Sequence, residues 1–204
     1  AALFLWSAAA RSEDRATLEA LPEAGLPISH SLSGNYLSGR YAQRKQDWRA
    51  AQTYMGEVVL RDADNSVMMQ RAFLLSIGAG RMDHARTLAD IILKESPDSE
   101  IMLIFMASAA LADGRYDAAL NHLEALPSDG FGDYTKPLLT AWSMAGKGRI
   151  DEAREVLEAA SVREDATFLF HIGLLNEWAG DDKAAEKAYT AAMAEGLSMH
   201  SALL

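Results

Sequence analysis

The side chains best suited to hold a metal ion are the histidines, because the chain has no cysteine. They are His30, His84, His122, His171 and His200. No two of them stand with a carboxylate at the spacing of H-E-x-x-H, which places metal ligands on one helix face. We therefore predict that the histidines are either exposed or hydrogen-bonded inside the protein. The chain is expected to hold no metal ion and no cofactor.

Three kinds of short segment resemble active-site motifs only in part. Gly78-Ala79-Gly80 lacks the preceding strand and the third glycine of a phosphate-binding loop, so it indicates a helix end. Asp62-Ala63-Asp64-Asn65 lacks the glycine and the distant glutamate of a calcium loop and is typical of a turn. Acidic pairs such as Asp151-Glu152 suit the first turn of a helix. No nucleophile motif is present, so we predict no catalytic residue and a protein that is not an enzyme.

Composition narrows the class of protein further. The chain has 204 residues, of which 50% are hydrophobic and 24% charged, which favours a folded protein over a disordered one. Its net charge of −10 argues against nucleic acid as a partner, because such proteins usually present a basic surface. Alanine is frequent, and it is the best helix former, so a mostly helical protein is expected.

The N-terminal residues 1–10 are apolar, end in small residues and are followed by charged residues. This pattern resembles the end of a signal peptide, and an amphipathic N-terminal helix is the alternative. We predict a signal-peptide remnant at residues 1–10 and a linker or capping helix at 11–31. The expected location is periplasmic or otherwise extracytoplasmic, with a cytoplasmic one as the alternative. No other stretch reaches the roughly 20 apolar residues of a membrane span.

A glycine-centred segment recurs along the chain. Gly-Arg-x-Asp begins at Gly80, Gly114 and Gly148, a period of 34 residues that is typical of helix–turn–helix repeats. An alanine follows at nearly the same spacing in five places. These alanines are Ala51, Ala85, Ala119, Ala153 and Ala185. The regular spacing predicts that one supersecondary unit is repeated.

The third copy of the segment shows how such a unit is expected to fold. Residues 101–112 are apolar and long enough for a first helix, and Gly114 can supply the left-handed residue that ends it. Asp117 then suits the first turn of a second helix, which Pro127 ends. Ala119 is small at the point where the two helices are expected to cross, because a larger side chain would separate them.

These residues resemble the tetratricopeptide repeat. The resemblance implies an all-α fold, namely a right-handed superhelix (α-solenoid) of antiparallel helix pairs with about five repeats. The predicted repeats are residues 32–65, 66–99, 100–133, 134–165 and 166–199, and residues 200–204 would start a further one. Two positions depart from the pattern: Phe73 stands where the other repeats have a small residue, and Gln46 stands where they have the turn glycine.

A closer resemblance involves two segments. Residues 32–40 and 140–146 are similar to a family of exported alphaproteobacterial tetratricopeptide proteins with no established activity. This similarity adds weight to the extracytoplasmic location, and it implies a longer natural chain.

Arrays of this kind bind partners along a concave face lined by the first helix of each repeat. By resemblance, the predicted groove residues are Tyr36, Arg40, Arg44, Gln70, Leu74, Ile104, Ser108, Leu138, Trp142, Phe170, Leu174 and Trp178. Burial of Trp142 and Phe170 against the next repeat is the alternative interpretation. Family members that hold chaperone C-terminal tails have basic or amide residues at five of these positions. Only one of those five is basic in this chain, so we predict that this carboxylate clamp is absent.

Charge is unevenly distributed along the sequence. Residues 35–50 carry a net charge of +3, from Arg40, Arg44, Lys45 and Arg49 against Asp47, whereas residues 95–133 carry −7. The simpler interpretation is a solvated outer face with charge pairs. The alternative is an electrostatic axis that orients a partner.

The function expected from these patterns is a non-enzymatic scaffold that binds a peptide or protein segment along the groove. The alternatives are a regulatory segment of a longer enzyme and a receptor for a small apolar ligand. Neither nucleic acid nor an integral membrane span is expected. Leu175, Tyr189 and Ala192 are expected to need a cover after residue 196, so either the chain continues or the C-terminal repeat end supports self-association.

Overall fold

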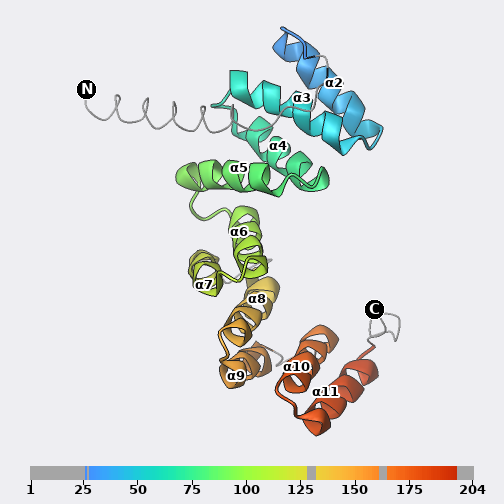
Figure 1. The fold of residues 1–204 in the computed structure, drawn as a ribbon, viewed down its shortest axis with the longest axis vertical. Helices are drawn as coiled ribbons and strands as arrows, with labels where there is room; N and C mark the ends of the chain where they lie inside the picture. Colours follow the sequence, from blue (N-terminus) through green and yellow to red (C-terminus); the bar gives the residue numbers. More distant parts are fainter. Residues whose placement is uncertain (1–25, 27, 128–131, 161–164, 197–204) are drawn as a thin grey trace, which may run out of the picture. The chain divides into compact units, whose positions relative to one another are not determined.

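In the part of the chain that the computed structural model describes, all the regular secondary structure is α-helical (Figure 1). That part comprises residues 26, 28–127, 132–160 and 165–196. The predicted all-α class is therefore confirmed. The predicted signal-peptide remnant, most of the predicted linker and the start of a further repeat at 200–204 lie outside the described residues, as does His200.

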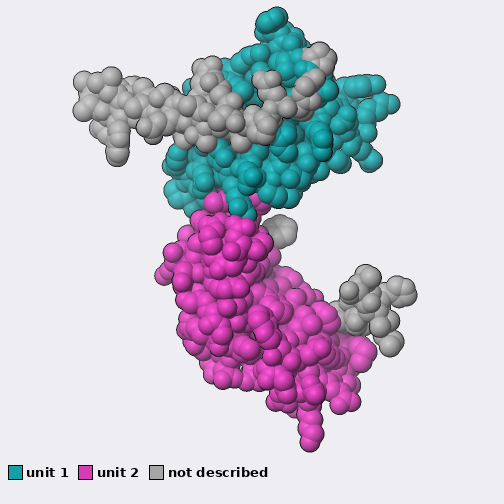
Figure 2. Space-filling model, in the orientation of Figure 1, with its two compact units in different colours: residues 1–97 teal, residues 98–204 magenta. Residues whose placement is uncertain are grey.

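The chain forms two compact units, residues 1–97 (unit 1) and residues 98–204 (unit 2) (Figure 2). The helices of unit 1 are α2 (Leu32–Arg44), α3 (Trp48–Arg61), α4 (Ser66–Gly78) and α5 (Met82–Glu95). Each helix packs against the next one along the chain. The pairs α2–α3 and α4–α5 fall within the predicted repeats 32–65 and 66–99.

Unit 2 contains six helices in its described residues. They are α6 (Glu100–Ala112), α7 (Tyr116–Ala125), α8 (Gly132–Gly146), α9 (Ile150–Ala160), α10 (Ala166–Trp178) and α11 (Asp182–Ala194). The helix α8 begins two residues before the predicted repeat start at 134. Leu157, Phe168 and Leu175 belong to one buried cluster between α8, α9 and α10.

The turn inside each helix pair has the same backbone geometry. Gly80, Gly114, Gly148 and Gly180 have φ between 71° and 79°, the left-handed conformation that favours glycine. At the first of them, Gly80 N donates to Ile77 O at 2.9 Å and Arg81 N donates to Ser76 O at 2.8 Å, which ends α4. Gln46 takes the same place in the first pair with φ of 60°. The glycines that recur every 34 residues in the sequence therefore occupy turns that require a left-handed backbone conformation.

The repeated alanines are buried on the second helix of each pair. Ala51, Ala85, Ala119 and Ala153 have no exposed surface, and Ala185 is 4% exposed. A larger side chain at these positions would have to displace the partner helix, because protein cores are close-packed. The predicted crossing role of Ala119 agrees with its complete burial.

A second kind of contact packs consecutive helix pairs against each other within each unit. The Trp48 side chain of α3 lies over Gly78 of α4, where an added Cβ would stand 3.4 Å from the indole ring. The Tyr116 side chain of α7 lies over Gly146 of α8 so closely that an added Cβ would overlap the phenol ring. Both contacts join an aromatic residue at repeat position 17 to a glycine at position 13 of the next repeat.

A buried polar cluster lies between α3, α4 and α5. The His84 Nδ1 atom is 3.0 Å from Gln52 Nε2 and 2.7 Å from Ser76 Oγ, and all three side chains are buried. The Ser76 hydroxyl group also lies 2.7 Å from Ala72 O. Burial, followed by the positive charge of Arg81, lowers the pKa of His84 to about 4. His84 is therefore a neutral, internally hydrogen-bonded histidine, one of the two environments expected for the histidines.

The last helix pair, α10 and α11, exposes fewer apolar side chains than the sequence predicted. Leu175 and Ala192 are fully buried, and Tyr189 is half-buried against Gly173 and Phe170. The expectation that all three would be left uncovered is wrong for Leu175 and Ala192. Leu175 belongs to the buried cluster of α8, α9 and α10, and α11 packs against α10. Met193 remains 43% exposed on α11.

Candidate functional site

The polar part of the predicted surface in unit 1 is built around the Tyr36 hydroxyl group. Tyr36 and Arg40 lie one turn apart on α2, and Arg71 approaches from α4. The Tyr36 hydroxyl oxygen accepts hydrogen bonds from Arg40 Nη1 at 3.1 Å and from Arg71 Nη1 at 3.3 Å. The Arg40 guanidinium group also lies 5.9 Å from the centre of the Tyr36 ring. These contacts, with the Arg40 hydrogen bond foremost, lower the pKa of Tyr36.

A pocket of about 320 Å³ opens along α4 beside this group. Its lining residues are Gln43, Trp48, Val67, Gln70, Arg71, Leu74 and Leu75. Gln70 and Leu74 are predicted groove residues, and Leu74 is 58% exposed. Because Arg71 belongs both to the pocket and to the Tyr36 group, the polar and apolar parts form one surface of unit 1.

Two other features of α2 lie outside this pocket. Arg44 is exposed in the last turn, one turn beyond Arg40. A separate hollow of about 650 Å³ lies on another face of α2, where Leu37 and Tyr41 are each 65% exposed. This second hollow was not predicted from the sequence.

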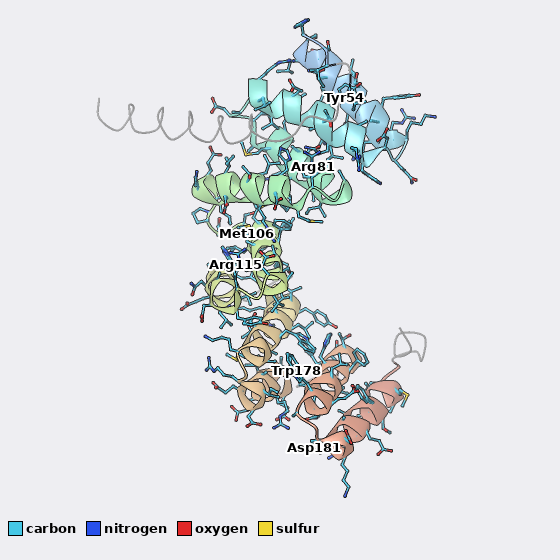
Figure 3. The ribbon with its side chains drawn as sticks, in the orientation of Figure 1. Tyr54, Arg81, Met106, Arg115, Trp178 and Asp181 are labelled. Atoms are coloured by element: carbon cyan, nitrogen blue, oxygen red, sulfur yellow. The ribbon has the colours of Figure 1, made fainter. Side chains whose placement is uncertain are left out.

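In unit 2, the exposed part of the predicted surface is aromatic. The Trp142 ring of α8 stacks on the Trp178 ring of α10, with 6.0 Å between ring centres and 26° between planes. Trp142 Nε1 donates to His171 Nδ1 at 3.1 Å, and burial lowers the pKa of His171, which favours the neutral ring as an acceptor. Figure 3 shows Trp178 at the end of α10, on the side where α8 lies. This tryptophan is 55% exposed.

The remaining predicted residues of unit 2 are neither fully buried nor fully exposed. They are Ile104 and Ser108 on α6, Leu138 on α8, and Phe170 and Leu174 on α10. Leu138 and Trp142 pack partly against the buried cluster of α8, α9 and α10. Phe170 contacts Tyr189 of α11, with 5.8 Å between ring centres. Trp142 therefore packs partly on the core, whereas the ring contacts of Phe170 are with Tyr189 and His171.

None of the twelve predicted groove residues is buried in the structure. In unit 1 the structure brings Tyr36 and Arg40 together, and Gln70 and Leu74 together. In unit 2 it brings Trp142 and Trp178 together. Whether this surface binds a partner stays a prediction.

Several residues of this surface were missed by the sequence argument. Arg71 stands one residue after a predicted groove position, and its long side chain turns back toward α2. Trp48 is on a second helix yet lines the pocket of α4, and His171 is the acceptor for Trp142. The glycines at positions 78 and 146 were the available signal for an aromatic neighbour such as Trp48.

The side chains of these two surfaces carry groups that make non-covalent contacts. Guanidinium and amide groups donate hydrogen bonds, and the aromatic and aliphatic groups offer apolar contact. Among the described residues, no group of three or more histidines and carboxylates is arranged to hold a metal ion. None of the helices described in Figure 1 combines the length and apolar composition needed to cross a bilayer.

Solved structures with a similar fold include MamA from Desulfovibrio magneticus RS-1. Its fragment from residue 41 to the end is 19% identical, with a TM-score of 0.65, over 83% of this chain and 97% of that one. A double mutant of MamA RS-1 is also 19% identical, with a TM-score of 0.68, over 86% of this chain and 99% of the other. A further MamA crystal structure is 17% identical, with a TM-score of 0.67, over 85% and 96% of the two chains.

The fold is a tetratricopeptide-like α-solenoid. The likeness to these MamA structures, together with the helix pairs of both units, confirms the fold class predicted from the 34-residue period. At these levels of identity the likeness concerns the fold alone. No family model matches the chain, and no curated protein matches it.

Proposed function

We propose that this chain is a non-enzymatic interaction protein that binds an extended segment of a partner protein on the first-helix faces of its units. The observation that carries the proposal is the exposure of large apolar side chains at predicted groove positions. Leu74 is 58% exposed beside the pocket of unit 1, and Trp178 is 55% exposed on the Trp142 ring. Such side chains, with polar groups beside them, are typical of binding sites for partner segments.

An extended peptide fits these surfaces better than a small apolar molecule. The pocket along α4 is open to solvent and is edged by Gln70 and Arg71, so it can accept a side chain while leaving the main chain of the peptide outside. A receptor for a small ligand usually encloses most of its ligand.

The proposal can be tested by site-specific photo-crosslinking in cells that contain the natural partners. A photoreactive phenylalanine analogue at Leu74 or Trp178 should give discrete crosslinked protein bands. The matched control is the same analogue at Leu37, which is at least as exposed on a first helix but faces the other hollow. Crosslinking that is as strong from Leu37 as from both groove positions would contradict the assignment of the face.

The location of the protein in the cell is a separate part of the proposal. The apolar residues 1–10 and the similarity to exported tetratricopeptide proteins support a bacterial envelope, with a partner in the same compartment. Fractionation of cells that express the natural gene should recover the protein with periplasmic markers. Recovery with cytoplasmic markers would contradict this part and leave the binding face unaffected.

A further inference from the structure

Trp178 of unit 2 presents an exposed aromatic ring that its neighbours hold in place. The ring stacks on that of Trp142, with 6.0 Å between ring centres. Trp142 is fixed in turn by His171, which accepts the hydrogen bond of the Trp142 indole at 3.1 Å and meets its ring edge to face. An exposed indole that is stacked on a second one offers a ligand a flat face rich in π electrons.

The end of α10 at which Trp178 lies favours positive charge. Trp178 is the last residue of this helix, and the carbonyl groups at a helix C-terminus carry a partial negative charge. The last turn of α10 has no basic residue. Arg154 reaches α10 from α9, but it pairs with Asp151 and donates to Asn176. The helix that carries Trp178 therefore contributes no cation of its own to this end.

Three exposed carboxylates follow or precede Trp178 closely along the chain, namely those of Glu177, Asp181 and Asp182. Glu177 Oε2 accepts a hydrogen bond from the Tyr189 hydroxyl group at 2.6 Å, and Asp181 Oδ1 accepts one from Ala184 N at 3.1 Å. Within the described residues, none of the three forms an ion pair. Their negative charge is thus available to attract a cationic ligand.

The distribution of charge between the two units points the same way. Residues 98–204 contain 18 acidic residues and 8 lysines and arginines, whereas residues 1–97 contain 11 of each kind. The whole net charge of −10 therefore belongs to unit 2. Complementary charge favours a basic ligand on this unit.

We infer that the Trp178 ring, stacked on Trp142, is a binding site for an arginine side chain of a partner segment. A guanidinium group is planar, so it can lie flat on the indole, where the electrons of the ring attract its charge. The end of α10 and the carboxylates beside it then stabilise that charge. The inference rests on the proposed binding function and specifies the chemistry of the partner at unit 2.

Two peptides that differ only in charge test the inference. Both are capped at each end, rich in glycine and serine, and carry Leu-Arg-Leu or Leu-citrulline-Leu at the centre, since citrulline keeps the planar shape of arginine without its charge. In titrations followed by ¹⁵N spectra, the arginine peptide should bind about fivefold more tightly. The arginine peptide should shift the indole signal of Trp178, and its advantage should shrink as the salt concentration rises.

Variants of the ring locate the effect on the chain. Trp178→Leu should abolish the preference for arginine over citrulline, and Trp178→Phe should retain part of it, because phenylalanine binds cations less strongly than tryptophan. Trp178 is 55% exposed, so neither change should unfold the protein. The matched control is Tyr41→Leu, which removes an aromatic ring that is 65% exposed on unit 1 and should preserve the preference.

A second pair of variants tests the role of the carboxylates. Glu177→Gln combined with Asp182→Asn should lower the preference for arginine by about twofold. Glu186→Gln combined with Glu195→Gln makes the same change of charge further along α11 and should leave the preference unchanged.

Equal affinity for the arginine and citrulline peptides would overturn the inference, as would the absence of binding by both. A preference that survives in Trp178→Leu, or that is lost equally in Tyr41→Leu, would also overturn it. If crosslinking from Trp178 still captures a partner in these cases, the proposed function stands and only the arginine specificity fails. If crosslinking from Leu74 and Trp178 fails as well, both proposals fall.

Discussion

Gln46 has a backbone conformation that favours glycine, although it carries a side chain. It ends α2 with φ of 60°, in the conformation that glycine adopts in the turns of the other helix pairs. A side chain costs about 1–2 kcal/mol in this conformation, because its Cβ comes close to the following carbonyl group. Two hydrogen bonds of the turn stabilise this strained conformation. Gln46 N donates to Gln43 O, and Asp47 N donates to Ala42 O.

Gln46→Gly should therefore stabilise the protein. The released strain exceeds the extra entropy of glycine in the unfolded chain, so we expect a gain of about 0.5–1 kcal/mol in the free energy of unfolding. Urea denaturation would measure it. The reciprocal variant, Gly80→Gln, should lose a similar amount, because its φ is 71° and no atom would contact the new Cβ. A loss of stability in Gln46→Gly would show that the Gln46 side chain contributes contacts that outweigh the strain.

His84 should make stability depend on pH. The folded protein protonates this ring only near pH 4, whereas the unfolded chain does so near the unperturbed value of 6.5. The unfolded state therefore binds more protons between these values, and acidification favours unfolding. Stability should be unaffected by this group above about pH 6.5, fall by up to about 3 kcal/mol between pH 6.5 and 4, and change no further below pH 4.

Denaturation curves over this pH range would test the role of His84 when compared with His84→Gln. The variant keeps a hydrogen-bonding side chain and removes the titrating ring, so the difference between the two proteins should carry the histidine contribution. Parallel pH profiles for the two proteins would mean that another group is responsible.

At the scale of the helices, the close approach of α7 and α8 depends on the absence of a side chain at Gly146. An added Cβ would overlap the Tyr116 ring, which must then move. Gly146→Ala should therefore cost about 1–3 kcal/mol, although alanine is the better helix former. Thermal unfolding would measure the loss.

A control and a second variant make the test of Gly146 specific. Gly56→Ala, on α3, places its Cβ at an ordinary contact distance of 3.9 Å from Gln52 Nε2 and should stabilise the protein by up to about 1 kcal/mol. Combining Gly146→Ala with Tyr116→Leu should recover part of the loss, because the two residues share one contact. Simple addition of the two single effects would indicate that α7 and α8 do not meet through this pair.

The sequence predicted the features of these helices that depend on backbone geometry. The turn at Gly80 and the buried Ala85 follow from the repeat, because a left-handed turn and a helix crossing each require one type of residue. The same reasoning put Tyr36 and Arg40 on one helix face. It did not find that Arg71 reaches Tyr36, because a long flexible side chain can turn in several directions. The partners of His84 were also missed, since they come from helices that only folding brings together.

At the scale of the whole molecule, the last described helix pair presents an apolar side chain that could contact a second copy of the chain. Met193 is the large apolar side chain that remains exposed on α11, and we propose that the chain self-associates through this end. Sedimentation equilibrium should show a mass that rises with protein concentration. Fusion of a designed polar helix after residue 196, or Met193→Glu, should keep the protein monomeric. A monomeric mass for the unmodified chain at all concentrations would contradict the proposal.

The contacts of Trp48 with Gly78 and of Tyr116 with Gly146 also determine how this chain could be rearranged by duplication or recombination. An aromatic residue at the start of one repeat's second helix has to be followed by a repeat with glycine near the end of its first helix. The fifth predicted repeat has Trp178 at that position, so placing it directly after the third would put this indole where Tyr116 needs an empty space. The repeats share one architecture, but the contacts between neighbouring repeats restrict the order in which they can follow one another.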